Sequence, residues 1–177
     1  MRKLAIICAL LLVTTLAQAQ VPKLGVGAFG GLSLPIAQQD QASGTEFGLR
    51  ARLTLLPFLS GEAQLAFTKW GTPDPINGVP WTEGSKVTEF GINGVLGGGA
   101  GIGIKPFFVA GFGSYKVKND ATKDEFTRMG YSAGLGLGIG FVPKINLDAR
   151  GEVVVIPMAE GGSKKAIKAT AGFFFNF

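Results

Sequence analysis

The chain has 177 residues, of which 46% are hydrophobic and only 16% are charged, and its formal net charge is +5. The charged fraction is well below the roughly 25% of an ordinary soluble domain, and so mild a positive charge does not indicate a nucleic-acid partner. There is no histidine and only one cysteine, which argues against a zinc or iron site.

The N-terminal segment has the pattern of a secretory signal peptide. Two basic residues, Arg2 and Lys3, precede an apolar run over residues 4–16, and an A-x-A motif ends at residue 19. This pattern predicts a signal peptide over residues 1–19 that is cleaved on export. Residues 20–177 would then form the mature domain, without the single cysteine.

The rest of the chain alternates apolar and polar residues with period two, which predicts β-strands. No apolar run after residue 19 approaches the ~20 residues of a membrane helix. In the fifth predicted strand Phe107, Phe108 and Phe112 fall on both faces, so its facing stays open. The predicted strands cover residues 24–34, 45–55, 61–69, 87–96, 105–117, 127–139, 145–155 and a last strand through residue 177.

The predicted connections alternate between short turns and longer polar loops. The longer connections lie around residues 35–44, 71–85, 118–125 and 157–164, and the others around residues 56–60, 97–104 and 140–144. An even number of antiparallel strands, with short turns at one end and longer loops at the other, is typical of membrane β-barrels.

Alternation alone does not say which face is outside, because a soluble lipocalin-like barrel has the same period with its apolar face inward. The polar face here is rich in small residues and nearly free of lysine, which favours the membrane arrangement. Aromatic residues near the strand ends also suggest two interfacial girdles: Phe47, Trp70, Tyr115 and Tyr131 at one end, and Phe58, Phe107, Phe141 and Phe177 at the other. We predict an all-β, eight-stranded antiparallel up-and-down transmembrane β-barrel.

The last strand ends in the run Phe-Phe-Phe-Asn-Phe, in which Phe173, Phe175 and Phe177 share the apolar face. This terminus and the strand pattern resemble the small eight-stranded bacterial outer-membrane barrels, the group of OmpX, the OmpA transmembrane domain and the Ail-type adhesins. The resemblance implies that these three phenylalanines are a signal for the barrel assembly machinery. It also implies a monomer in contact with outer-membrane lipid.

With the apolar face outward, the polar face lines a lumen that carries ten charges. Buried charges are tolerated only when they are paired, and hairpin geometry suggests the pairs Arg52–Glu62 and Glu152–Lys168. A path for ions or solutes is one interpretation. A closed structural plug is favoured, because side chains can fill an eight-stranded interior. The predicted luminal charges are Glu46, Arg50, Arg52, Glu62, Glu89, Arg128, Asp148, Arg150, Glu152 and Lys168.

Two sequences match enzyme motifs by letter only. Residues 130–134 match G-x-S-x-G, which needs a strand-to-helix turn and a histidine base, and residues 25–30 match G-x-G-x-x-G, which needs a following helix. The lack of histidine also argues against a PagP-type acyltransferase or an omptin-type protease. We therefore predict no enzymatic activity and no cofactor.

Function is then expected in the loops. Trp81, in the longest predicted loop, is a candidate contact for a partner, with a headgroup-level position as the alternative. The rim carries lysines that could bind lipopolysaccharide phosphates: Lys69, Lys86, Lys116, Lys118, Lys123, Lys164 and Lys165. The predicted function is envelope structure or surface interaction, and the alternative is a porin-like or OmpW-like conduit for small solutes.

Overall fold

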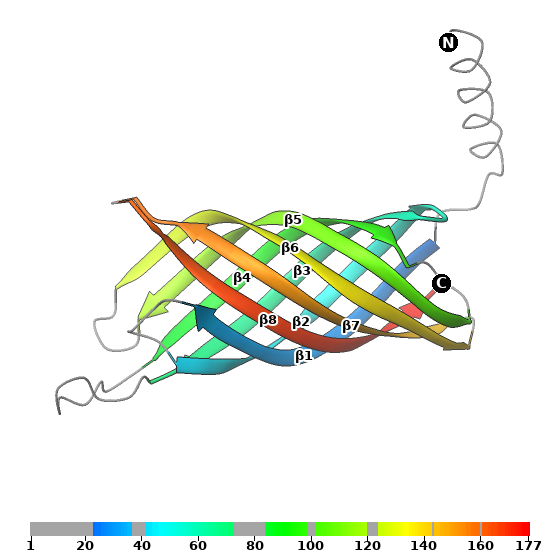
Figure 1. Ribbon diagram of the computed structural model, residues 1–177, viewed down its shortest axis with the longest axis horizontal. Helices are drawn as coiled ribbons and strands as arrows, with labels where there is room; N and C mark the ends of the chain where they lie inside the picture. The colour runs from blue at the N-terminus through cyan, green and yellow to red at the C-terminus, as the bar shows by residue number, and fades with distance from the viewer. Residues whose placement is uncertain are drawn as a thin grey trace, which may run out of the picture.

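The computed structural model describes residues 23–36, 42–72, 84–98, 102–119, 124–142, 144–159 and 161–177. They form one closed barrel in which neighbouring strands are antiparallel and β8 pairs with β1 (Figure 1). The strands are β1 (Lys23–Ile36), β2 (Ala42–Leu56), β3 (Leu59–Gly71), β4 (Ser85–Gly97), β5 (Gly103–Asn119), β6 (Glu125–Val142), β7 (Ile145–Pro157) and β8 (Ser163–Asn176). The predicted all-β, eight-stranded, up-and-down architecture is confirmed.

The barrel has two different ends, which we call the turn end and the loop end. Residues 57–58 join β2 to β3 at the turn end, whereas residues 72–84 join β3 to β4 at the loop end and form the longest connection. The C-terminus lies at the turn end (Figure 1), where the Phe177 amide donates to the Leu24 carbonyl at 2.9 Å.

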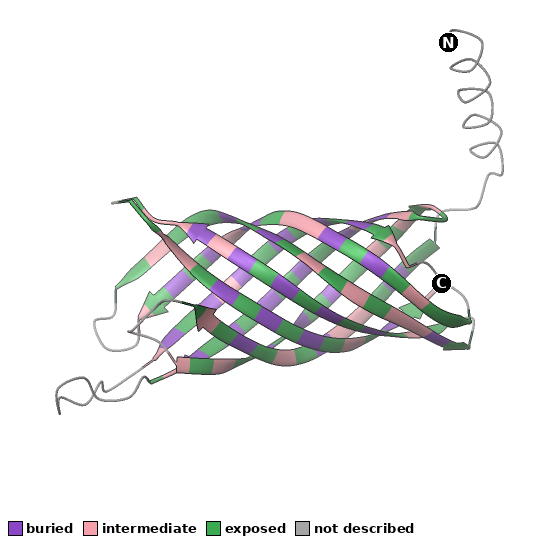
Figure 2. Cartoon of the chain, in the orientation of Figure 1, coloured by how far each residue is buried: buried purple, intermediate pink, exposed green. Residues whose placement is uncertain are grey.

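Burial along the strands is inverted relative to a soluble protein. Exposed and buried residues alternate (Figure 2), and it is the apolar side chains that are exposed: Leu49 is 60% exposed, while its neighbour Arg50 is buried. Lipid favours this arrangement, because the apolar surface then faces the hydrocarbon and the polar groups face one another inside. The soluble, lipocalin-like arrangement is therefore excluded.

The structure settles the facing of β5. Phe107 is only 4% exposed and points into the barrel, whereas Phe108 is 42% exposed and points outward. The inward position is accessible to a phenyl ring because Phe107 stands opposite Gly136 of β6 in the register, and glycine leaves the space that the ring occupies.

Three aromatic residues predicted for the interfacial girdles lie inside the barrel instead. Trp70 is 3% exposed and Tyr115 is 1% exposed, and Phe107 joins them in the interior. The prediction was wrong for these three because it used their nearness to strand ends and not their alternation with the inward residues. The other five, all exposed, are Phe47, Phe58, Tyr131, Phe141 and Phe177.

Inward glycines are needed where neighbouring strands approach closely, and this gives a matched test. A Cβ atom at Gly31 would overlap the carbonyl oxygen of Ala169 on β8, whereas a Cβ atom at Gly61, on the outer face, meets nothing within 4 Å. We expect Gly31→Ala to lower the free energy of unfolding by about 1–3 kcal/mol. Gly61→Ala should be neutral or stabilise by up to ~1 kcal/mol. Urea unfolding of the two variants in vesicles measures both, and equal effects would contradict this description of the interior.

Candidate functional site

The centre of the lumen is occupied by Arg150, whose side chain is fully buried. Its guanidinium donates to Glu62 at 2.8 and 3.1 Å and to Asp148 at 3.0 and 3.1 Å. Bidentate contacts of this kind are the strongest that an arginine makes with carboxylates. The alternation of β3 and β7 directs all three side chains inward.

Arg52 of β2 binds the same two carboxylates from the turn-end side. It donates to Glu62 at 2.6 and 2.9 Å and to Asp148 at 2.8 Å. Arg52 and Glu62 stand directly opposite each other in the β2–β3 register, as the hairpin geometry predicted. Two arginines thus surround two acids, and this part of the lumen has no net charge.

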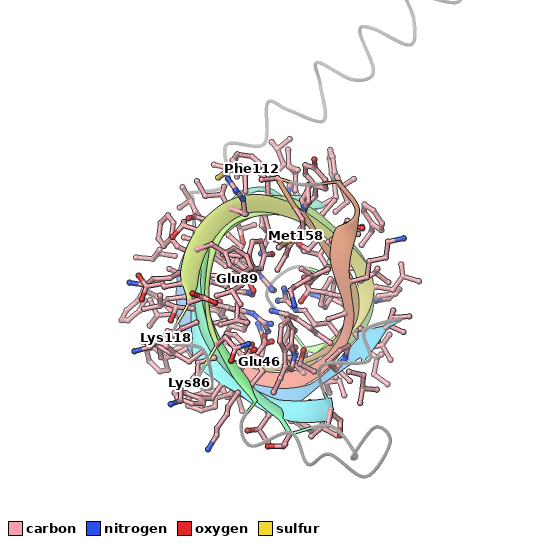
Figure 3. The ribbon with its side chains drawn as sticks, turned by 90° about the vertical axis from the view of Figure 1, so that its left-hand side faces the viewer. Glu46, Lys86, Glu89, Phe112, Lys118 and Met158 are labelled. Atoms are coloured by element: carbon pink, nitrogen blue, oxygen red, sulfur yellow. The ribbon has the colours of Figure 1, made fainter. Side chains whose placement is uncertain are left out.

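A second group of charges lies nearer the loop end, where Glu46 and Glu89 project into the lumen (Figure 3). The Lys168 ammonium binds Glu46 at 2.8 Å and also binds Glu89. Tyr115 donates its hydroxyl to Glu89 at 3.0 Å. Lys168 stands opposite Glu152 in the register, but its side chain extends across the lumen, so the predicted Glu152–Lys168 pair is replaced by these contacts.

Arg50 connects the two groups. It donates to Gln64 at 2.8 Å and to Thr170 at 3.1 Å, and its guanidinium lies 3.6 Å from the centre of the Phe29 ring. Its contact with Glu152 is 3.7 Å long. Hydrogen bonds and a cation–π contact therefore hold the guanidinium across the lumen.

Nine of the ten predicted luminal charges lie in the lumen, where Arg52 is partly buried and the other eight are buried: Glu46, Arg50, Arg52, Glu62, Glu89, Asp148, Arg150, Glu152 and Lys168. Arg128 is the exception, because it is exposed. It alternates with the inward residues of β6 and stands opposite Tyr115, but the pairing of β6 with β7 begins only at Tyr131. Arg128 therefore lies beyond the closed wall, and its assignment to the luminal network was wrong.

The remaining predicted site residues lie elsewhere. Phe173, Phe175 and Phe177 are exposed on the outer face, and Phe175 and Phe177 contact each other edge to face with ring centres 5.1 Å apart. Their role as an assembly signal stays a prediction. Trp81 and the predicted signal peptide over residues 1–19 lie outside the residues that the structure describes.

An apolar layer lies at each end of the charged region, and neither layer was predicted from the sequence. The loop-end layer consists of Trp70, Val87, Tyr115, Val117, Val154, Ile156 and Ala166. The turn-end layer consists of Val95, Phe107 and Val109. The loop-end layer could have been predicted from the alternation of residues, since Val154 and Ile156 continue the inward positions of β7 beyond Arg150.

Two cavities beside these layers, within the described part of the chain, are small. The cavity between Trp70, Tyr115 and Lys168 has a volume of about 10 Å³, and the cavity between Arg52, Phe107 and Phe174 has about 20 Å³. Each has room for about one water molecule. The Trp70 indole is fixed in the loop-end layer by a hydrogen bond to the Ser33 hydroxyl at 2.9 Å.

The interior position of Trp70 can be tested by fluorescence, because the chain has only two tryptophans. In a Trp81→Phe variant, we expect blue-shifted emission from Trp70 that is weakly quenched by acrylamide and by bromine-labelled lipid. The control moves the only tryptophan to an outward position, with Phe90→Trp added to Trp70→Phe and Trp81→Phe. It should be strongly quenched by brominated lipid. Strong lipid quenching of Trp70 would instead place it in a girdle.

Two further features are absent from the described ranges. No three histidine, cysteine, aspartate or glutamate side chains come together there in a way that could hold a metal ion. In the same ranges, no helix is long and apolar enough to cross a membrane.

Comparison with protein families matches residues 5–175 to the outer membrane protein beta-barrel domain. The chain belongs to this family. The outward apolar face is therefore the surface of a transmembrane barrel, and the family places the barrel in the bacterial outer membrane. No curated protein matches the chain.

Solved structures share the fold. Neisserial surface protein A superposes with a TM-score of 0.69 at 16% identity, over 87% of this chain and 97% of that chain. The N-terminal β-barrel domain of Pseudomonas aeruginosa OprF gives 0.59 at 18% identity, over 88% and 97%. Ail of Yersinia pestis, in complex with the heparin analogue sucrose octasulfate, gives 0.57 at 13% identity, over 89% and 100%. At these identities the likeness concerns the fold alone.

Proposed function

We propose that this outer-membrane barrel is a closed, non-enzymatic scaffold that serves envelope structure or surface interaction through its extracellular loops. The observation that carries the proposal is the order of layers along the lumen: an apolar layer, a region of paired charges, and a second apolar layer. A solute would have to displace side chains in all three in turn.

The charged region supports a structural role because its groups bind one another. Glu62 accepts hydrogen bonds from two arginines, and Arg150 is held by two carboxylates. An ion crossing this region would break contacts between buried or partly buried charges, which costs several kcal/mol for each buried group left uncompensated. The same pairing fixes the relative positions of β2, β3 and β7.

The interior also offers little for catalysis. Ser132, in the letter match to the nucleophile elbow, is a buried inward residue in the middle of β6, and the chain has no histidine to act as its base. The buried carboxylates Glu62 and Asp148 are occupied by arginines. Function then falls to the loops, where a rigid scaffold usually carries it.

Deletion of the protein from its host tests the proposal against the alternative of a conduit. We expect cells without the barrel to lose detergent resistance or surface binding, while uptake of small solutes stays unchanged. Restoration by the full-length protein, and not by a variant with residues 73–83 shortened, would support a role for the loops. Slower solute uptake in cells with an intact envelope would overturn the proposal in favour of a conduit.

A further inference from the structure

Three lysines form a row on the outer face of the barrel at the loop end. Lys69 of β3 stands opposite Lys86 of β4, and Lys86 stands opposite Lys118 of β5. All three side chains are exposed, and Figure 3 shows Lys86 and Lys118 pointing away from the lumen on the same side of the wall. Like charges directly opposite each other destabilise a sheet, so the row favours an anionic partner.

Nearby acids neutralise this face only in part. Glu125 stands opposite Lys118 in the register and binds Lys116, on the next outward position of β5, at 2.8 Å, and the exposed Asp124 precedes Glu125 in the chain. Lys86 and Asp124 each have an interaction of their own as well. Within the described residues, four lysines thus share two acids, and this part of the rim keeps a positive charge.

An apolar groove begins below the lysine row. Leu65 lies four residues from Lys69 along β3 and stands opposite Phe90 of β4. Leu65 and Phe90 both line a groove of about 590 Å³. At 3.4 Å per residue and a strand tilt of about 40°, the groove starts ~10 Å below the lysines along the membrane normal. Its floor is formed by small residues, among them Ala51 and Ala63.

The wall between the two features is also apolar. Phe67 lies two residues below Lys69, and its ring stacks with that of Phe47 at 5.5 Å between centres. From the rim toward the middle of the membrane, the outer face therefore presents cations, then aromatic rings, and then an apolar groove. A phospholipid or a glycolipid with phosphates presents its groups in the same order.

We propose that the outer face of the barrel from β8 through β1 to β5 binds one phosphorylated lipid of the outer leaflet, with its phosphates over β3 to β5 and an acyl chain over β8 and β1 to β4. Its phosphates lie against Lys69, Lys86 and Lys118, and one acyl chain enters the groove beside Leu65 and Phe90 and extends over Ala51. The site goes beyond the closed scaffold proposed above and does not depend on it. Charge favours a lipid over a second copy of this chain, because a two-fold contact through this face would bring the two lysine rows together.

The test compares two variants that each lose three positive charges. K69Q/K86Q/K118Q removes the row, and K23Q/K105Q/K144Q removes three lysines from the turn end. Native mass spectrometry of the folded proteins measures retention of lipid A with two phosphates, lipid A with one phosphate, and zwitterionic phosphatidylcholine. We expect the first variant to bind lipid A with two phosphates at least about tenfold more weakly. The turn-end variant should bind it as the wild type does.

A groove variant and competition by free phosphate distinguish binding of the whole lipid from binding of its phosphates alone. Ala51→Phe fills the floor of the groove and should weaken lipid A binding while leaving the lysines in place. Inorganic phosphate should compete only at concentrations far above those of lipid A. Equal binding by the two triple-lysine variants would overturn the proposal. So would a groove variant that binds lipid A normally, or a dimer that forms through this face and excludes lipid.

Discussion

Replacing Arg150 with methionine is expected to lower the free energy of unfolding of the barrel by about 3–5 kcal/mol. The guanidinium makes four hydrogen bonds to Glu62 and Asp148, and methionine fills most of its volume without replacing its charge. The two carboxylates would then keep the contacts of Arg52 and the longer contacts of Arg50, and Glu62 would keep the 3.4 Å hydrogen bond from Asn93.

Equilibrium unfolding by urea in lipid vesicles measures the effect of this change. Arg128→Met is the matched control, because it removes the same side chain from an exposed position and should change stability by less than about 0.5 kcal/mol. Adding Glu62→Gln to Arg150→Met should cost less than the sum of the single changes, since the two residues are in direct contact. Equal effects of Arg150→Met and Arg128→Met would contradict the buried network.

The second large effect is expected from Phe107→Ala, at about 3–5 kcal/mol. The ring fills the turn-end layer and lies 5.4 Å from the guanidinium carbon of Arg150 and 5.5 Å from that of Arg52. Its loss would open a cavity beside two buried charges. Phe108→Ala is the control, since it removes the same ring from the outer face and loses about 1.5–3 kcal/mol of transfer energy without a cavity.

Substitution of Gly136 gives a second way to distinguish the inward Phe107 from the outward Phe108. A Cβ atom at Gly136 would overlap the ring of Phe107 and approach the Ala149 carbonyl oxygen to 2.8 Å. Gly136→Ala should therefore destabilise the wild type strongly, and less in the Phe107→Ala background, where the ring is gone. With Phe108→Ala the two effects should add. Additive effects for Phe107 and Gly136 would show that the ring does not cover this glycine.

The strand pattern and the facing of seven strands could be predicted from the sequence, because alternation of period two is a local property of the chain. The same property was sufficient to place nine charged side chains in the lumen. Trp70 and Tyr115 were misplaced although their alternation was visible: counting by two from Thr68 along β3 assigns Trp70 to the interior. Amphipathic aromatic residues suit an interfacial girdle and a luminal layer equally well.

The partners of the luminal charges could not be predicted in the same way. Closure of the barrel brings Lys168 of β8 within reach of Glu46 on β2 and Glu89 on β4, and these contacts depend on the strand stagger and not on sequence neighbours. Arg128 shows the same limit, because its exposure depends on where β7 stops pairing with β6. The facing of β5 could be assigned only once the register was known, because Phe107 stands opposite Gly136.

The conductance of the wild-type barrel in a planar lipid bilayer tests most directly whether the lumen is closed. With the apolar layers and the charge network in place, we expect no current steps above the bilayer background in 1 M KCl. Arg150→Met should also stay silent, because the two apolar layers remain. Reproducible current steps from the folded wild-type monomer would contradict the closed lumen.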